Sequence, residues 1–361
     1  LNECNGIYDV LVEDGIIKKI SEGIDEGLAD QVVDASGKCL MPGFIDLHVH
    51  FREPGFTHKE TVKTGSMAAA RGGYTSVFCM PNTKPVIDSA ESYKLLEDII
   101  SKDAVVNVHP VGAVTKGQKG EELAEIEKMA SLGMLAISED GKSVMDSAIY
   151  RKAMKIARNA GVAVFAHCED INLVEKGVMN AGKRAGELGF RGISNAVEDI
   201  ITARDIMLAK ETGAKLHLCH CSTKDSVAMV KEAKDNGINV TAEVCPHHFT
   251  LTDADIPGDD ANYKMNPPLR TREDVNALLK GISDGIMEVI STDHAPHSFD
   301  EKNTSIEKAP FGIVGLETAF ALSYSELVLK NVISLSDLVR CMSANPAKVA
   351  GIDRGTLAEG K

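Results

Sequence analysis

Short apolar runs alternate with longer amphipathic segments along most of this chain. Eight runs have the apolar, β-branched character of buried strands, and they span residues 39–51, 74–82, 105–114, 134–140, 162–170, 215–223, 239–249 and 287–297. The segments between them place apolar residues three and four positions apart, as in residues 147–160 and 223–237, which is typical of amphipathic helices. Eight successive strand–helix units predict an α/β fold, a parallel (β/α)8 barrel of the TIM type.

The two ends of the chain follow a different pattern. The stretch GIYDVLVEDGIIKKI alternates apolar and polar residues and turns at Asp14-Gly15, which predicts a small antiparallel unit outside the barrel. We expect residues 1–40 to be the N-terminal part of a small β-sandwich domain, residues 41–350 to form the barrel, and residues 351–361 to begin a C-terminal return to the small domain. Leu1 is no initiator methionine and GTLAEGK stops where a strand would start, so both ends are expected to be incomplete.

Composition and charge exclude several classes of protein. The chain has 361 residues and a net charge of −14 from 39 basic and 53 acidic residues, so it lacks the basic surface that nucleic-acid binding requires. No apolar run approaches the ~20 residues of a membrane span. The eight cysteines form no CxxC pair, which predicts reduced thiols and a cytoplasmic location.

Polar side chains stand at the ends of the predicted strands, where a TIM-type barrel carries its active site. A single histidine there is more often a hydrogen-bonded structural residue, and a single aspartate can cap the next helix. Six such side chains at one rim favour a shared cause. They are His48, His50, Asp140, His167, His220 and Asp293. Imidazole and carboxylate ligands suit Zn²⁺. Because six ligands exceed the three of a mononuclear catalytic site, we predict two metal ions ~3.5–4 Å apart, with Asp140 placed to bridge them.

Several motifs carry a resemblance to a known family. DLHVHFREPG, MPNTKPVID, SEDGK, HCED, HCST, EVCPHH, NPPLRT, TDHAPH and APFGIVGLET occur in order along essentially the whole chain. They resemble the amidohydrolase superfamily and, within it, the bacterial class I dihydroorotases. The resemblance implies two zinc ions, one held by His48, His50 and Asp293 and the other by His167 and His220, with Asp140 and a hydroxide bridging them. Many members bridge with a carbamylated lysine, but this chain has Asp140 at that position, and Lys142 lies two residues beyond.

The resemblance also implies a reaction, the reversible cyclisation of N-carbamoyl-L-aspartate to L-dihydroorotate in de novo pyrimidine biosynthesis. The hydroxide would be the nucleophile for ring opening, and Asp293 would act first as general base and then as general acid. Arg52 lies two residues after His50, and strand alternation predicts that both side chains share one face. Arg52 would clamp the substrate carboxylate, and the further substrate contacts implied are Asn82, Asn266 and His297, with Phe311 and Gly312 through their backbone.

Partners and neighbouring segments complete the sequence-based picture. We expect a small-molecule substrate, a homodimer, and an association with aspartate carbamoyltransferase as a further option. The polar segment 298–310 is interpreted as a mobile lid over the site, with a solvated connection as the alternative. His247 and His248 are interpreted as structural residues, and the cysteines beside His167 and His220 are expected to face away from the site, toward the helices.

Two other functions remain open at this point. A hydantoinase or allantoinase shares the chemistry, but such enzymes typically bridge with carbamylated lysine and lack the implied carboxylate-binding set. A catalytically silent scaffold for another enzyme would be expected to have lost metal ligands, and none is missing here.

Overall fold

Eight strand positions form the ring that the sequence predicts. The computed structural model describes residues 6–361. The strands are β3 (Phe44–Val49), β4 (Tyr74–Cys79), β5 (Asn107–Pro110) continued by β6 (Gly112–Ala113), β7 (Ala136–Ser138), β8 (Ala163–Ala166), β11 (Leu216–Leu218), β12 (Val240–Val244) and β13 (Val289–Ile290). Neighbouring strands pair in parallel within two sheets, β3-β4-β5 and β6-β7-β8-β11-β12-β13. A parallel bridge between Val49 and His294 connects the last strand position to β3, which confirms the predicted (β/α)8 architecture.

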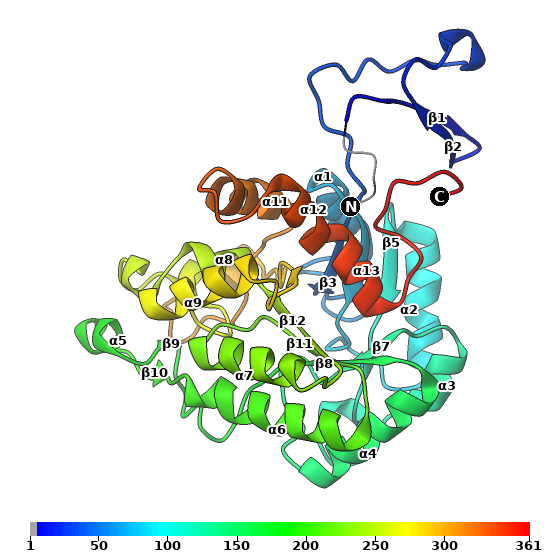
Figure 1. Cartoon of the computed structure of the whole chain (residues 1–361). Coiled ribbons are helices and arrows are strands. Elements are labelled where there is room, and N and C mark those ends of the chain that lie inside the picture. The colour runs from blue at the N-terminus through cyan, green and yellow to red at the C-terminus, as the bar shows by residue number, and fades with distance from the viewer. Residues whose placement is uncertain (1–5) are drawn as a thin grey trace.

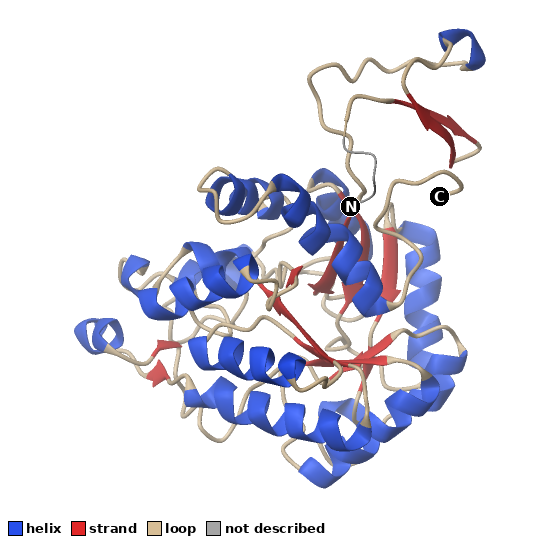
Figure 2. Ribbon diagram, in the orientation of Figure 1, coloured by secondary structure: helices blue, strands red, loops and turns tan. Residues whose placement is uncertain are grey.

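Helices surround this ring, as Figure 2 shows. The principal helices are α1 (Val62–Arg71), α2 (Ala90–Asp103), α3 (Ile126–Ser131), α4 (Ser147–Ala160), α6 (Ala196–Thr212), α7 (Lys224–Asp235) and α9 (Arg272–Ser283). Near the C-terminus α11 (Ala319–Ser323) continues into the π-helical η5 (Tyr324–Val328), and α12 (Leu335–Val339) continues through η6 (Arg340–Ala344) into α13 (Asn345–Ala350). Thr61 and Thr223 accept hydrogen bonds from the first turns of α1 and α7, so side-chain capping sets where these helices begin.

The strand residues alternate between two apolar clusters. Val164 on β8 belongs to the larger cluster, which packs the strands against helix residues such as Ala153 and Ala157 of α4. Phe165 belongs to a smaller cluster, and its ring lies 6.0 Å from that of Phe78 on β4. Because β4 and β8 are not neighbours, this contact crosses the interior of the ring. The core therefore fills both faces of the sheet, as the continuous apolar runs predict.

A two-stranded unit lies apart from the barrel (Figure 1). The strands β1 (Asp9–Glu13) and β2 (Ile16–Ser21) pair antiparallel around the predicted turn, where Asp14 has a φ of 52° and Gly15 a φ of 75°. The last residues return to this hairpin, since Ile17 donates to the Lys361 carbonyl at 2.8 Å and accepts from Gly360 at 2.8 Å. The division into domains at residues 40 and 350 stays a prediction.

Short elements complete the described chain. These are η1 (Glu26–Leu28), η2 (Lys116–Gln118), β9 (Met179–Asn180), α5 (Lys183–Leu188), β10 (Gly192–Ile193), α8 (Pro246–Thr250), η3 (Asp253–Asp255), η4 (Ala261–Tyr263) and α10 (Phe299–Lys302). Within residues 6–361, every helix is too short or too polar to cross a membrane.

Candidate metal centre

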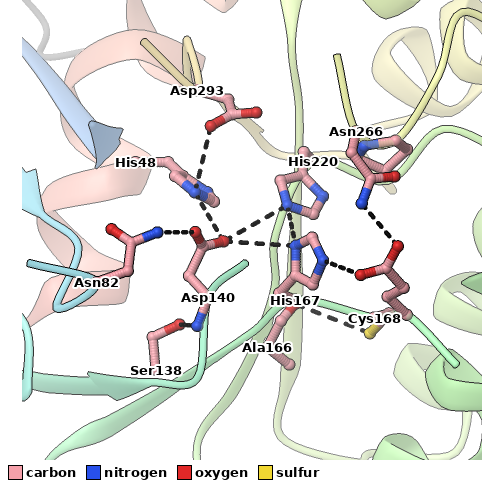
Figure 3. Close-up of polar contacts among 12 residues, drawn as sticks. His48, Asn82, Ser138, Asp140, Ala166, His167, Cys168, His220, Asn266 and Asp293 are labelled. Carbon is pink, nitrogen blue, oxygen red and sulfur yellow. Dashed lines mark hydrogen bonds and ion pairs between the residues drawn. The ribbon is translucent and has the colours of Figure 1, made fainter. Parts of the chain in front are cut away.

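The six residues predicted as metal ligands converge at the C-terminal ends of the strands. His48 lies on β3, and the other five lie one to three residues beyond the ends of strands; they are His50, Asp140, His167, His220 and Asp293. All six are buried, and Figure 3 shows His48, His167 and His220 around the Asp140 carboxylate, with Asp293 on the far side of His48. The sequence therefore identifies a single cluster, although their role as ligands stays a prediction.

One half of the cluster contains His48, His50 and Asp293. His50 Nε2 lies 3.2 Å from Asp293 Oδ1, and His48 Nε2 lies 3.5 Å from the same oxygen. One ligand atom from each residue falls within 4.8 Å of the others, as a bound ion requires. This is the group that the family resemblance assigns to one zinc ion.

The other half contains His167 and His220. His167 Nδ1 lies 2.8 Å from His220 Nε2, and the two nitrogens lie 3.4 Å and 3.8 Å from Asp140 Oδ1. Asp140 Oδ1 is also 3.1 Å from His48 Nε2, and Asp140 Oδ2 is 3.4 Å from His50 Nε2. Asp140 thus contacts imidazoles of both halves, which is the position that a bridging ligand needs.

Neighbouring acceptors orient three of the rings. His48 Nδ1 lies 3.0 Å from Glu243 Oε1, His50 Nδ1 lies 2.9 Å from Asn82 Oδ1, and His167 Nε2 lies 3.2 Å from Glu169 Oε2. A carboxylate or amide oxygen only accepts hydrogen bonds, so these ring nitrogens carry the proton. The opposite nitrogen of each ring therefore faces the centre, where it can hold either a proton or a metal ion, as the histidines of metal sites do.

This donor set fits a cation. Lone pairs of three imidazoles and the oxygens of two carboxylates face one another, and such groups repel unless a proton or a metal ion lies between them. His48 Nε2 is buried and makes no hydrogen bond within the described part of the chain. Mixed nitrogen and oxygen ligands of this kind suit Zn²⁺ and similar ions.

The charges of the cluster keep its carboxylates ionised. Burial alone would raise the pKa of Asp140, but His48, His167 and His220 hold it well below its ordinary value. Burial would lower the pKa of His167, yet Asp140 and Glu169 raise it to about 10. The cluster is therefore strongly polarised, with anionic oxygens beside imidazoles that attract positive charge.

Three site residues adopt left-handed backbone conformations. Arg52, His220 and Asp293 have φ values of 61°, 34° and 49°. Such conformations cost non-glycine residues of order 1–3 kcal/mol and concentrate at functional sites. They also interrupt strand alternation, so side chains are aimed in directions that the sequence pattern does not predict.

Arg52 reaches the site by a different route from the predicted one. Because β3 ends at Val49 and Arg52 has a left-handed backbone, alternation along a strand is not what directs Arg52 toward the site. The guanidinium instead donates from Nε to the Pro296 carbonyl at 3.1 Å, with Nη2 3.3 Å from His297 Nε2. Arg52 and His297 are thus adjacent, as a shared carboxylate subsite would require.

The remaining predicted substrate residues lie around the cluster. Asn82 Nδ2 donates to Asp140 Oδ2 at 3.4 Å, and Asn266 Nδ2 donates to Glu169 Oε1 at 2.7 Å. The Phe311 carbonyl accepts from His297 Nε2 at 2.8 Å, and the Gly312 amide donates to the Lys264 carbonyl at 3.0 Å. Two backbone groups at Phe311 and Gly312 are therefore already bonded, and their contact with substrate stays a prediction.

The segment 298–310 is more firmly attached than a solvated connection. It includes the short helix α10, and its Ile306 is fully buried in an apolar cluster with Val178, Met265 and Leu269. Lys302 donates to the carbonyls of Lys264, Pro310 and Gly312. The interpretation as a mobile lid stays a prediction. A motion of the whole segment would have to remove Ile306 from its apolar cluster.

The cysteines follow the prediction only in part. Cys168 and Cys221 pack in the larger apolar cluster, between the strands and the helices, as expected. Cys219 belongs to the smaller apolar cluster inside the ring. Its sulfur lies within 4.8 Å of a ligand atom of His48 and of Glu243. The expectation that Cys219 faces the helices is therefore wrong, because the turn of the backbone at His220 breaks the assumed alternation.

His247 and His248 lie at the start of α8, beside the cluster. His248 Nε2 donates to the Pro267 carbonyl at 2.9 Å, which ties α8 to the segment that carries Asn266. This contact agrees with a structural role for His248.

Sequence reasoning missed two of the residues that orient the rings, Glu243 and Glu169. Glu243 is fully buried on β12 and also contacts His217 Nε2 at 3.0 Å and Ser291 Oγ at 2.6 Å. A lone glutamate inside an apolar strand must find partners, and that signal could have identified it. Glu169 lies two residues after His167 and could have been found by the same reasoning.

Comparison with known proteins agrees with this geometry. A family model described as dihydro-orotase-like matches residues 37–226. The chain is 46% identical over 357 residues to a dihydroorotase of Acetivibrio thermocellus, which covers 99% of this chain and 84% of that protein. It is 48% identical over 363 residues to a dihydroorotase of Bacillus cytotoxicus, which covers 100% of this chain and 85% of that protein.

Solved structures place the same fold in a wider group. The L-hydantoinase of Arthrobacter aurescens matches with a TM-score of 0.86 and 25% identity over 98% of this chain and 81% of that chain. The dihydropyrimidinase of Brevibacillus agri matches with a TM-score of 0.85 and 25% identity over 98% and 80%. Since sequence identity to the dihydroorotases is nearly twice as high over the same length, this chain belongs to the dihydroorotase family.

Proposed function

We propose that this chain catalyses the reversible cyclisation of N-carbamoyl-L-aspartate to L-dihydroorotate, the dihydroorotase step of pyrimidine biosynthesis. One observation carries the proposal: the guanidinium of Arg52 and the ring of His297, 3.3 Å apart, adjoin a cluster of four imidazoles and two carboxylates. The cluster suits activation of water and of an amide carbonyl. The adjacent cation suits a substrate that carries a carboxylate.

The metal requirement fits the residues present. We propose two zinc ions, one held by His48, His50 and Asp293 and the other by His167 and His220, with Asp140 shared between them. When bound, such ions supply Lewis-acid polarisation of a carbonyl and lower the pKa of a water toward about 7. The chain's part is to hold the rings in the correct tautomer, which the contacts of His48 with Glu243 and His167 with Glu169 support.

Asp293 is proposed as the residue that moves protons. In ring opening its carboxylate would take a proton from the attacking water and deliver it to the departing ring nitrogen. In ring closure it would take the proton from that nitrogen. Burial would raise the pKa of Asp293, but His48 and His50 hold it below its ordinary range, so the carboxylate is ionised and available as a base.

The substrate carboxylate is proposed to bind between Arg52 and His297. Arginine presents a planar fork that matches a carboxylate, and the Nε bond to Pro296 fixes the direction of the guanidinium. Asn82 and Asn266 are proposed to complete the subsite from opposite sides of the cluster, since one contacts Asp140 and the other contacts Glu169.

The hydantoinase-type alternative rests on the fold. The structures named hydantoinase and dihydropyrimidinase share the architecture at 25% identity, whereas the dihydroorotases are 46–49% identical. Arg52 beside His297 further supports a charged substrate. A silent scaffold is not favoured, because the cluster keeps all six ligand side chains.

Assembly and location are proposed from the same family. We propose a cytoplasmic homodimer that can associate with aspartate carbamoyltransferase. The seven described cysteines are all unpaired, which supports a reducing compartment. Light scattering of the purified chain, alone and mixed with that enzyme, tests both associations.

Substrate turnover tests the proposed function. The zinc-loaded protein is assayed with N-carbamoyl-L-aspartate, dihydroorotate, dihydrouracil and hydantoin. We expect turnover of the two carboxylated compounds and little of the uncharged rings. Preferential turnover of dihydrouracil or hydantoin would replace the proposal by the hydantoinase alternative.

A further inference from the structure

Lys59 contacts the proposed carboxylate subsite although none of the roles above includes it. Its Nζ lies 3.2 Å from His297 Nδ1 and 3.0 Å from Glu301 Oε1. The side chain is only 16% exposed, so the ammonium group is held against these partners. It comes from the loop between β3 and α1, whereas His297 and Glu301 follow β13.

We propose that Lys59 is a positioning residue that fixes the tautomer of His297 and couples it to the segment 298–310. This inference rests on the proposed function in one respect, namely that His297 binds the substrate carboxylate. An ammonium group only donates hydrogen bonds, so the His297 nitrogen that faces it, Nδ1, must accept. The ring proton is then on Nε2.

The contact on the other side of the ring gives the same assignment. His297 Nε2 lies 2.8 Å from the carbonyl oxygen of Phe311, which can only accept. Nε2 also lies 3.3 Å from Arg52 Nη2; since a guanidinium only donates, this approach is a contact and not a hydrogen bond when Nε2 carries the proton. The N–H that Lys59 maintains is therefore on the side where the substrate carboxylate is proposed to bind.

Charge around the ring favours its neutral form. Burial, Arg52 and Lys59 lower the pKa of His297 to about 4, and only Glu301 opposes them among the charged groups facing it. Protonation would place an N–H against the Lys59 ammonium. A neutral ring with the opposite tautomer would instead turn a lone pair toward the carboxylate and repel it.

Glu301 holds Lys59 in place. Its second oxygen, Oε2, accepts from the backbone amide of Ser298 at 3.0 Å and from Ser298 Oγ at 3.1 Å, which caps α10. Lys59 also lies over the ring of Phe56, 5.5 Å from its centre. The ion pair thus links the loop after β3 to the first turn of α10, and displacement of α10 would release Lys59 from its counter-ion.

The expected kinetic consequence is a separation of KM from kcat. Lys59→Met should raise the KM for dihydroorotate by about 10- to 100-fold, the range of a hydrogen bond to a charged group, with a much smaller change in kcat. Lys59→Arg, which still donates to Nδ1, should restore most of the loss. Lys63→Met removes an exposed lysine four residues away and should leave both constants unchanged.

Nitrogen NMR of the ring tests the proposal without turnover. The full zinc-loaded chain is labelled with ¹⁵N-histidine, and His297 is identified by its loss in His297→Gln. Wild type and Lys59→Arg should show protonated Nε2 and bare Nδ1 between about pH 5.5 and 8.5. Lys59→Met should show mixed tautomers and a titration within that range, in a folded chain by circular dichroism.

Two outcomes separate this inference from the proposed function. An unchanged tautomer and an unchanged pKa of His297 in Lys59→Met would overturn the positioning role. The expected NMR change in a protein that does not turn over dihydroorotate would support the positioning role and overturn the proposed substrate.

Discussion

His48 and Glu243 are joined by a contact of 3.0 Å between Nδ1 and Oε1, and Glu243 also accepts from the backbone amide of His220 at 3.2 Å. One buried carboxylate on β12 thus orients a proposed ligand of each metal ion. Glu243→Gln keeps the side-chain volume, but it replaces one of the two acceptor oxygens by an NH₂ group that only donates. We expect metal affinity to fall about 10- to 100-fold, as for other partners of metal-binding histidines. Zinc retained after dialysis against graded chelator measures this.

Glu198→Gln is the matched control for that variant. Glu198 is also buried, but its partners are outside the six cluster residues: it accepts from Ser222 and Ser226 and lies 3.7 Å from Arg270. It should lower the free energy of unfolding without changing zinc retention. Equal zinc loss in both variants would show that the effect is general destabilisation.

Asp293 is expected to be essential for turnover but not for folding. Asp293→Asn retains the shape of the side chain and removes the base, so kcat should fall by about 10²- to 10⁴-fold. The barrel should persist, because the residue lies at its rim and its contacts are with His48 and His50 rather than with the apolar clusters. Steady-state kinetics with thermal unfolding checks both points, and wild-type turnover would remove Asp293 from the mechanism.

Arg52 is expected to determine the preference for a carboxylated substrate. Arg52→Met should raise the KM for dihydroorotate by about 30-fold or more, since truncating one partner of a buried charge pair costs about 2–5 kcal/mol. Arg52→Lys keeps the charge but lacks the planar fork, so its KM for dihydroorotate should lie between those of wild type and Arg52→Met. Residual turnover of dihydrouracil should not change, and an unaltered KM for dihydroorotate would contradict the assigned subsite.

The stability of the barrel should depend on pH through Asp205 of α6. Burial raises the pKa of Asp205 to about 6, although Arg204 lowers it from 2.8 Å away. The folded state then binds a proton more tightly than the unfolded state, so this stabilisation is present below about pH 4 and is lost as the pH rises through about 6. The side chain of Asp205→Asn cannot ionise. As the pH rises from about 4 to 7.5, the free energy of unfolding of this variant should therefore increase relative to that of wild type by on the order of 3 kcal/mol.

Urea unfolding of both proteins at several pH values measures this gain. Asp98→Asn replaces an exposed carboxylate on α2 and should show no such dependence. A difference between Asp205→Asn and wild type that is constant with pH would contradict the raised pKa.

The barrel could be predicted because its strands are buried on both faces and therefore read as continuous apolar runs. All eight predicted strands have counterparts, from β3 to β13. The pattern predicts the strand ends less accurately: the run 239–249 has the character of one strand, but β12 ends at Val244 and α8 begins at Pro246. Proline at the first turn of a helix supplies the physical reason, since it favours helix initiation and cannot donate within a sheet.

The site could be predicted in its residues but not in its contacts. Polar side chains after buried strands were sufficient to find His167 and Asp140, because the ends of parallel strands share one rim. Glu243 is signalled locally as a charged residue inside an apolar strand, but its partner His48 is not. Lys59 contacts His297 and Glu301, which lie far away in sequence, so no local pattern reveals its role. The directions of Arg52 and His220 depend on left-handed backbone conformations, which strand alternation does not anticipate.

Zinc content measured together with activity tests whether the cluster of four imidazoles and two carboxylates is a metal site that acts on dihydroorotate. The chain is stripped of metal, titrated with zinc, and assayed with dihydroorotate after each addition, while elemental analysis gives the bound metal. We expect activity to rise with zinc and to reach its maximum near two ions per chain, and we expect Asp140→Ala to fail to hold the pair. Full activity in a folded chain with almost no metal, or two bound ions that leave dihydroorotate untouched, would contradict this expectation.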